Sequence, residues 1–211
     1  MSPSTTKGVA RQRAGLMVEI ALAFAVSAAL WLAIYFLVPP LAGMDAPLAR
    51  LVFALKCGCV AILFSFVMAI EAVAHERFQS PAIDPLAGFT TRRMTINLRY
   101  LEHTLEQLMV FLPGLLGLAW YCDSGAAMRA VVATAAVWIV NRIAFWIGYH
   151  QGPLHRAAGA PGMALGFVVL LYVGARFGDE LAGWPGAVAV VALFLGGEAI
   201  LFRTTRPMTQ P

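Results

Sequence analysis

Long apolar runs alternate with short polar segments along the chain, and six of the runs are candidates for membrane spans. They cover residues 15–38, 48–74, 96–121, 126–149, 161–177 and 185–202. A helix needs about 20 predominantly apolar residues to cross a membrane, with a range of roughly 17 to 25. The first four runs meet this length easily, and the last two lie at its short end. The pattern therefore predicts an all-α integral membrane protein.

The composition favours the same class of protein. Hydrophobic residues make up 60% of the 211 residues, charged residues make up 12%, and the mean hydropathy is +0.77. A soluble domain carries roughly 25% charged residues. The first apolar run is too long for a cleavable signal peptide, and no small-x-small cleavage site follows it before Pro39. We expect this run to remain as a transmembrane helix.

Lysine and arginine are distributed unequally between the two sides of the predicted spans. Nine lie at ends that share one side, and three lie on the other: Lys7, Arg11, Arg13, Arg77, Arg92, Arg93, Arg156, Arg203 and Arg206 against Arg50, Arg129 and Arg176. Positive residues are retained in the cytoplasm. We therefore expect the 75–95 loop and both tails, a disordered basic one at 1–14 and a short one at 204–211, to be cytoplasmic. These flanks explain the net charge of +4, and no nucleic-acid-binding motif accompanies them.

The cysteines and two isolated charges favour structural roles. Cys57 and Cys59 are about 200° apart around a helix, and Cys122 lies at the far end of the third run, so the spacing predicts no metal site. Lys56 is near the outer end of its helix, where its side chain can reach the membrane surface. Glu71 is at helical spacing from His75, which predicts a local pair, although it could also face a polar cavity.

The third run opens with a polar stripe that is costly at a membrane boundary unless its charges pair or bind something. Arg99, His103 and Glu106 are at positions i, i+4 and i+7, which places them on one face of a helix. Glu102 is within reach of Arg99, so these two could neutralise each other. Glu106 lies about 15 Å along the helix from Ile96, too deep for a headgroup residue, and is a candidate functional carboxylate.

The fourth run ends with a second polar stripe. Arg142 and Tyr149 are seven residues apart, and Arg156 follows after another seven, at the start of the fifth run. An unpaired guanidinium inside a membrane is improbable, so we expect Glu106 or Glu102 on the preceding helix to pair with Arg142. The two stripes together predict a cationic pocket with embedded carboxylates, suited to an anionic, partly polar ligand that enters from the cytoplasm.

These residues resemble the motifs of a known family. The pattern Arg99-x-x-x-His103-x-x-Glu106 is similar to the R-x-x-x-N-x-x-E signature of the MAPEG family, the membrane-associated proteins of eicosanoid and glutathione metabolism. The pattern Arg142-x-x-Phe145-x-x-Gly-Tyr149, followed by an arginine, is similar to the family's R-x-x-Y-x-x-G-Y element. The resemblance covers four helices at about 48–177 and leaves one extra transmembrane helix at each end, at 15–38 and 185–203.

The resemblance implies a homotrimer of four-helix units in a bacterial inner membrane, with glutathione bound between subunits on the cytoplasmic side. Arg99, His103, Glu106, Arg142 and Tyr149 would position glutathione, and Arg156 would stabilise its thiolate. A free thiol has a pKa near 8.5, and a neighbouring guanidinium lowers that pKa and raises the thiolate fraction. The implied activity is that of a glutathione transferase or peroxidase acting on a lipophilic electrophile or a lipid hydroperoxide.

Two departures from the family pattern leave other functions open. His103 replaces the usual asparagine, which could make ligand affinity depend on pH, and Phe145 replaces a tyrosine and lacks its hydroxyl. One alternative is a non-catalytic protein of the same fold that binds lipid or glutathione. Another is a small transporter or assembly subunit that uses Lys56, Glu71 and Glu198 as buried charges, although no paired broken helices support it.

Overall fold

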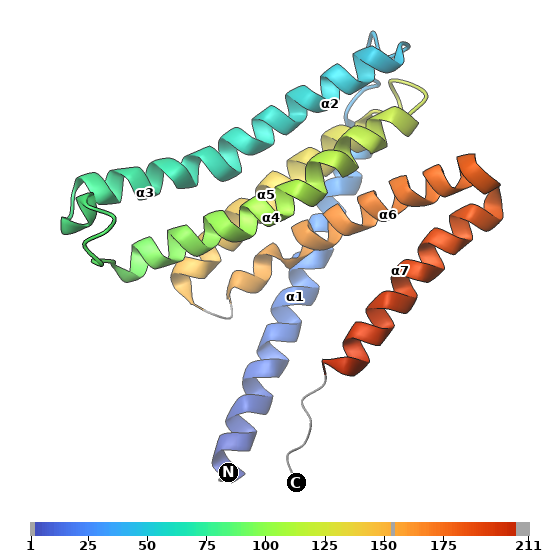
Figure 1. Cartoon of the computed structure of the whole chain (residues 1–211). Helices are drawn as coiled ribbons and strands as arrows, with labels where there is room; N and C mark the ends of the chain where they lie inside the picture. The colour runs from blue at the N-terminus through green and yellow to red at the C-terminus, as the bar shows by residue number, and fades with distance from the viewer. Residues whose placement is uncertain (1–2, 153–154, 206–211) are drawn as a thin grey trace.

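In the computed structural model, which describes residues 3–152 and 155–205 and side chains from Gly15 onward, all regular secondary structure of the described residues is helical (Figure 1). The predicted all-α fold is confirmed. The elements are α1 (Pro3–Leu37), α2 (Pro47–Ile62), the π-helical turn η1 (Leu63–Val67), α3 (Met68–Phe78), the 3₁₀ turn η2 (Pro81–Ile83), α4 (Arg92–Tyr121), α5 (Arg129–Gln151), the 3₁₀ turn η3 (His155–Gly159), α6 (Ala160–Ala182) and α7 (Trp184–Thr204).

The prediction for the first 14 residues is wrong, and the predicted tail at the other end lies mostly outside the described residues. The backbone is already helical at Pro3, so α1 includes most of the segment expected to be a disordered tail at 1–14. Most of the predicted tail at 204–211 falls on residues that the structure does not describe. Helix α6 also continues beyond the predicted end at residue 177, to Ala182.

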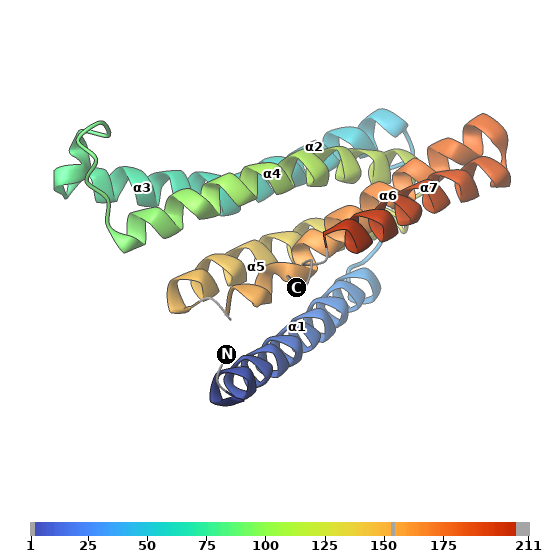
Figure 2. The ribbon, with the colours of Figure 1, turned by 60° about the horizontal axis from the view of Figure 1, so that its bottom comes forward.

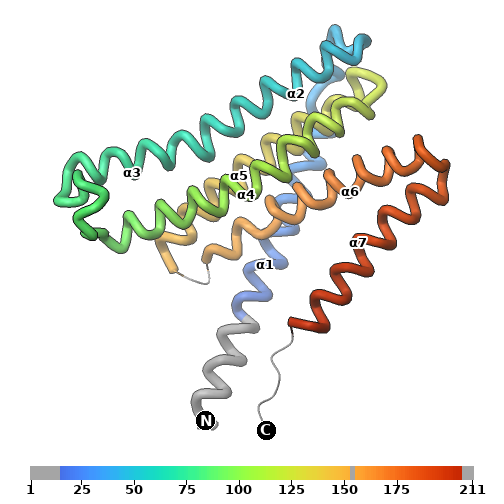
Figure 3. Tube along the Cα trace, in the orientation of Figure 1, coloured from blue at the N-terminus to red at the C-terminus, as the bar shows by residue number. Residues whose placement is uncertain are grey.

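Five stretches in the described residues are long and apolar enough to cross a membrane: Gly15–Leu37, Pro47–Phe78, Arg129–Gln151, His155–Ala182 and Trp184–Thr204. The second consists of α2, η1 and α3, which follow one another as a single rod (Figure 3). Helix α4 is not among the five, although its sequence was expected to qualify easily. Its amino-terminal half carries Arg92, Arg93, Arg99, Glu102 and Glu106, and these charges lower its mean hydropathy.

The connections between helices gather at two ends of the molecule. The loop after α3, the turn η3 and the end of α7 lie toward one end, and the α4–α5 and α6–α7 connections lie at the other (Figure 1). The segments at the first end are those that the lysine and arginine distribution assigns to one side of the membrane. Figure 2 shows α1 as a separate rod alongside α5.

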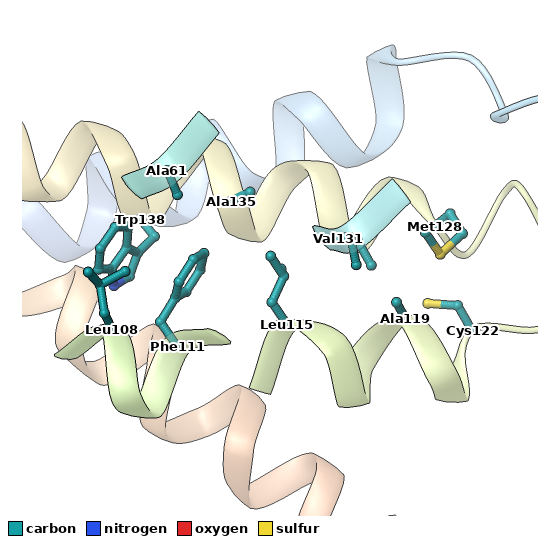
Figure 4. Close-up of a cluster of buried hydrophobic side chains, with 11 residues drawn as sticks. Ala61, Leu108, Phe111, Leu115, Ala119, Cys122, Met128, Val131, Ala135 and Trp138 are labelled. Carbon is teal, nitrogen blue, oxygen red and sulfur yellow. The ribbon is translucent and has the colours of Figure 1, made fainter. Parts of the chain in front are cut away.

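The core lies where α2, α4 and α5 meet. The rings of Phe111 and Trp138 are stacked with centroids 4.3 Å apart, and Leu115, Val131 and Met128 continue the same buried row toward the α4–α5 connection (Figure 4). Small residues bring α6 close to this core. A side-chain carbon at Gly114 would lie 3.5 Å from the backbone of Leu170 on α6, as is common where membrane helices pack closely.

Helices α1 and α7 are held to the other helices by different kinds of contact. Among the described elements α7 contacts only α6, and none of its residues is buried. Helix α1 is joined to α5 by side-chain hydrogen bonds: the indole of Trp31 donates to the hydroxyl of Thr134 at 3.1 Å, and the amide of Asn141 donates to the hydroxyl of Ser27 at 3.0 Å. Such bonds between membrane helices contribute about 0.6 to 2 kcal/mol each, so α1 is specifically oriented on α5.

The α6–α7 hairpin yields the first prediction. A side-chain carbon at Gly178 would lie 2.6 Å from the carbonyl oxygen of Gly186, and one at Gly186 would overlap the carbonyl of Gly178. We expect Gly186→Ala to destabilise the protein by about 1 to 3 kcal/mol, since overpacking forces backbone shifts. Gly196→Ala is the control, because that position has nothing within 4 Å. Thermal unfolding in detergent measures both, and equal midpoints would contradict the close α6–α7 contact.

Candidate functional site

The side chain of Arg142 is completely buried, at 0% exposure, between α4 and α5. Its Nη1 donates to the side-chain oxygen of Gln107 at 2.8 Å, and its Nη2 donates to the hydroxyl of Thr104 at 2.9 Å. The rings of Phe145 and Tyr100 lie against the guanidinium, with centroids 4.5 and 5.1 Å from its carbon. The positive charge is therefore surrounded by neutral acceptors and aromatic faces.

The prediction that Glu106 or Glu102 pairs with Arg142 is wrong. Glu102 accepts a hydrogen bond from Arg99 at 2.7 Å, and Glu106 lies 3.3 Å from the Nδ1 of His103. Both pairs run along α4, and all four side chains are exposed. The two carboxylates form pairs within their own helix and leave the buried guanidinium to other groups.

The reason is the rotation of α4 about its axis. Tyr100, Thr104 and Gln107 repeat the spacing of the predicted stripe one residue later, and one residue turns a helix by about 100°. This second stripe faces α5 and holds Arg142, whereas the side chains of Arg99, His103 and Glu106 are exposed. We name Tyr100, Thr104 and Gln107 the inner stripe.

A π-helical turn supports the inner stripe. The hydroxyl of Tyr100 donates to the backbone carbonyl of Ser65 at 2.8 Å, and Ser65 belongs to η1. The hydroxyl of Ser65 donates in turn to the carbonyl of Ala61 at 2.6 Å. Single π-helical turns occur frequently at functional sites. Here the turn connects the rod α2–α3 to the ring that lies beside Arg142.

One polar atom of the Arg142 side chain has no hydrogen-bond partner among the described residues. The Nε of Arg142 is buried and makes no hydrogen bond to any described residue. An unsatisfied buried donor costs about 1 to 3 kcal/mol. An anionic ligand next to Arg142 would be attracted by its charge, which no carboxylate in the described residues neutralises directly.

Two adjoining cavities open beside Arg142, and we call them together the Arg142 pocket. The first has about 240 Å³ and is lined by α4, α5, η3 and α6, through His103, Gln107, Arg142, Phe145, Arg156, Ala157, Gly159, Ala160 and Met163. The second has about 220 Å³ and includes His103, Glu106, Gln107, Val110, Trp138 and Met163 in its wall. They share His103, Gln107 and Met163, and together they reach the size of small-molecule sites, roughly 300 to 1,000 Å³.

The structure brings four of the six predicted site residues together. His103, Glu106, Arg142 and Arg156 line the Arg142 pocket. Arg99 is exposed and is not among its lining residues. Tyr149 is half-buried, and its ring centroid lies 5.5 Å from that of Phe145, but it does not line the pocket either.

Sequence reasoning missed a neutral cluster beside the site. The side-chain oxygen of Asn97 accepts from the indole of Trp146 at 2.9 Å and from the Nε2 of His150 at 3.0 Å. Asn97 is three residues before Tyr100 and belongs to the buried face of α4. The signal was available in the sequence as a polar residue in phase with the inner stripe. The cluster fixes α4 against α5 next to Arg142.

The charges proposed for a transporter are not buried. Lys56, Glu71 and Glu198 are all exposed in the described chain. Glu71 lies 3.7 Å from His75, four residues along α3, so it forms the predicted local pair. The premise of three buried charges is wrong.

A comparison with protein-family models decides the family. The model of the MAPEG family matches residues 50–178, which is more than half of the chain. The chain belongs to the MAPEG family. Its match runs from α2 to α6 and contains the whole Arg142 pocket, whereas α1 and α7 lie outside it. With five stretches able to cross a membrane, this MAPEG protein is an integral membrane protein. No curated protein and no solved structure matches the chain significantly.

The hydrogen bonds of Arg142 yield the second prediction. Thr104→Val keeps the side-chain shape but removes the hydroxyl that accepts from Arg142. We expect a loss of about 1 to 3 kcal/mol in unfolding free energy, since a buried charged donor is left unsatisfied. Thr95→Val is the control, because Thr95 is exposed on the same helix. Denaturant unfolding followed by circular dichroism compares the two, and equal losses would contradict the structural role of Thr104.

Proposed function

We propose that this protein binds glutathione in the Arg142 pocket and activates its thiol for attack on a lipophilic electrophile or a lipid hydroperoxide. The observation that carries the proposal is a buried guanidinium, which no carboxylate of the described residues contacts, in the wall of a pocket of ligand size. Membership of a family of glutathione and eicosanoid metabolism gives independent support.

The charges of the pocket complement those of glutathione. The tripeptide carries two carboxylates and one ammonium group. Arg142 and Arg156 supply two cations, and Glu106 supplies one carboxylate. Guanidinium groups bind carboxylates with two parallel hydrogen bonds, and Glu106 can accept from an ammonium. Gln107 orients the guanidinium from the wall that the two cavities share.

Arg156 is the residue we assign to the thiol. It is exposed and lines the cavity from η3, whereas Arg142 is held deep in the wall. A guanidinium beside the glutathione sulfur lowers the thiol pKa, and the proton leaves to water. In conjugation the thiolate forms a carbon–sulfur bond while the bond to the leaving group breaks and that group departs with its electron pair. In the peroxidase reaction two glutathione molecules become a disulfide while the hydroperoxide becomes an alcohol and water.

The assembly and orientation belong to the same proposal. Arg99 and Tyr149 do not line the pocket of one chain, and we propose that they complete the site from a neighbouring subunit of a homotrimer. The lysine and arginine bias supports a cytoplasmic position for this end of the helices, in a bacterial inner membrane.

A second candidate function is binding without thiol chemistry. Phe145 lies against the Arg142 guanidinium at 4.5 Å and lines the pocket, so the hydroxyl of the family's tyrosine is missing there. A protein that only presents a lipid would keep the cationic pocket and lack turnover.

The third prediction concerns the thermal stability of the protein with each ligand, which distinguishes the glutathione-dependent enzyme from a lipid-binding protein. A ligand that binds only the folded state stabilises it by about 2.7 kcal/mol at one hundred times its dissociation constant. We expect glutathione to raise the unfolding temperature of the detergent-purified protein, and Arg142→Met to abolish the increase. Stabilisation by a fatty acid together with none by glutathione would favour the lipid-binding function and contradict the transferase.

The fourth prediction concerns the rate of glutathione conjugation when Arg156 is replaced. We expect Arg156→Ala to lower the rate of glutathione conjugation to a chlorinated dinitrobenzene by at least about tenfold, since the sulfur loses its cation. Arg176→Ala is the matched control, because Arg176 lies over the ring of Tyr121 at 5.0 Å, away from the pocket. Size-exclusion chromatography checks that the assembly is intact in both variants. Normal turnover of Arg156→Ala would remove its assigned role.

A further inference from the structure

Helix α1 contacts its neighbours through a row of side chains spaced eight, four and four residues apart. The contacts pair Glu19 with His155 at 3.2 Å, Ser27 with Asn141 at 3.0 Å, Trp31 with Thr134 at 3.1 Å, and the ring of Tyr35 with the guanidinium of Arg129 at 5.0 Å. The last three partners belong to α5. The first partner belongs to η3. This row therefore fixes α1 on α5 and connects the middle of α1 to a turn of the Arg142 pocket.

This contact joins Oε1 of Glu19 to Nδ1 of His155, and Glu19 is half-buried whereas His155 is exposed. His155 is the first residue of η3 and is directly followed by Arg156. A 3₁₀ turn of five residues has few internal hydrogen bonds, so its position depends on the contacts that it makes with other elements.

The turn η3 forms a wall between two cavities. His155 and Ala158 line a cavity of about 510 Å³ between α1 and α5, whereas Arg156, Ala157 and Gly159 line the Arg142 pocket. Because one short turn presents residues to both cavities, we expect a displacement of His155 to move the neighbouring Arg156 as well.

Helix α5 packs closely against η3. A side-chain carbon at Gly148 would overlap the carbonyl of His155, and one at Gly159 would overlap the side chain of Phe145. These contacts limit the approach of η3 to α5. Movement along the surface of α5 is limited instead by side-chain contacts, and the ion pair between Glu19 and His155 is one that α1 provides at the start of the turn.

We propose that Glu19 is a positioning residue, which holds His155 and thereby fixes η3 with Arg156 over the Arg142 pocket. Helix α1, which lies outside the family match, then contributes to the geometry of the site. The consequence for turnover rests on the proposed function. The positioning of η3 does not, and it is measured separately.

Hydrogen–deuterium exchange of the full-length protein in detergent tests the positioning. We expect the amides of residues 155–160 to exchange faster in Glu19→Ala, while those of residues 129–141 on α5 keep their wild-type rates and show that the fold persists. Glu19→Gln retains an acceptor for the Nδ1–H of His155 and is expected to keep the wild-type exchange rates.

The matched control is Glu71→Ala, which removes the carboxylate of another glutamate–histidine pair, at 3.7 Å on α3. It should leave the exchange of residues 155–160 unchanged. Wild-type exchange of this segment in Glu19→Ala would overturn the proposal, and so would equal acceleration in Glu71→Ala.

Turnover tests the consequence for catalysis. We expect Glu19→Ala to lower kcat for glutathione conjugation by about tenfold with a smaller change in KM, since small displacements of a positioned group slow the chemical step. Adding Glu19→Ala to Arg156→Ala should cause little further loss, because the two changes act through one group. Wild-type kcat in Glu19→Ala would overturn the catalytic consequence. No conjugation by the wild-type protein would refute the proposed function, while the exchange result still decides the positioning.

Discussion

The buried guanidinium of Arg142 is the constraint on which the site depends. A charge inside a helix bundle is strongly unfavourable unless hydrogen bonds or other charges compensate it. The protein compensates it with the inner stripe of α4 and two aromatic faces. This arrangement requires α4 to be rotated so that Thr104 and Gln107 face α5, and the π-helical turn holds Tyr100 in the same orientation through Ser65. The packing of three helices is thus linked to one side chain.

The charge of Arg142 is compensated by neutral groups, and this has a consequence for ligand binding. A carboxylate in direct contact with Arg142 would cancel its charge, and the pocket would have little attraction for an anion. Thr104 and Gln107 instead satisfy two nitrogens and leave the charge in place, beside a cavity that Arg156 also lines. The glutamates of α4 stay on its outer side, where Glu106 reaches the adjoining cavity. Separated cations and carboxylates of this kind match a zwitterionic peptide better than a purely anionic or purely apolar ligand.

The sequence predicts much of this structure, and the failures have physical causes. Long apolar runs locate the six hydrophobic segments, and motif spacing identifies the family and four residues of the pocket. The partner of Arg142 could not be identified because two polar stripes with equal spacing run along α4, and their order around the helix depends on contacts with α5. Thr104 and Gln107 carry no charge, so the sequence does not distinguish them as partners of Arg142 beside Glu102 and Glu106. The π-helical turn and the contact between Glu19 and His155 are tertiary features without a local sequence signal. The charges on α4 explain why a helix within the bundle is less apolar than its neighbours.

A structure of the protein determined with glutathione tests the central claim most directly. The account predicts density for the tripeptide in the Arg142 pocket, with its carboxylates toward Arg142, its ammonium near Glu106 and its sulfur beside Arg156. Density that continues to Arg99 or Tyr149 of a neighbouring subunit would extend the site across the predicted trimer. A pocket that remains without glutathione at saturating concentration, or that holds an acyl chain in its place, would contradict the account.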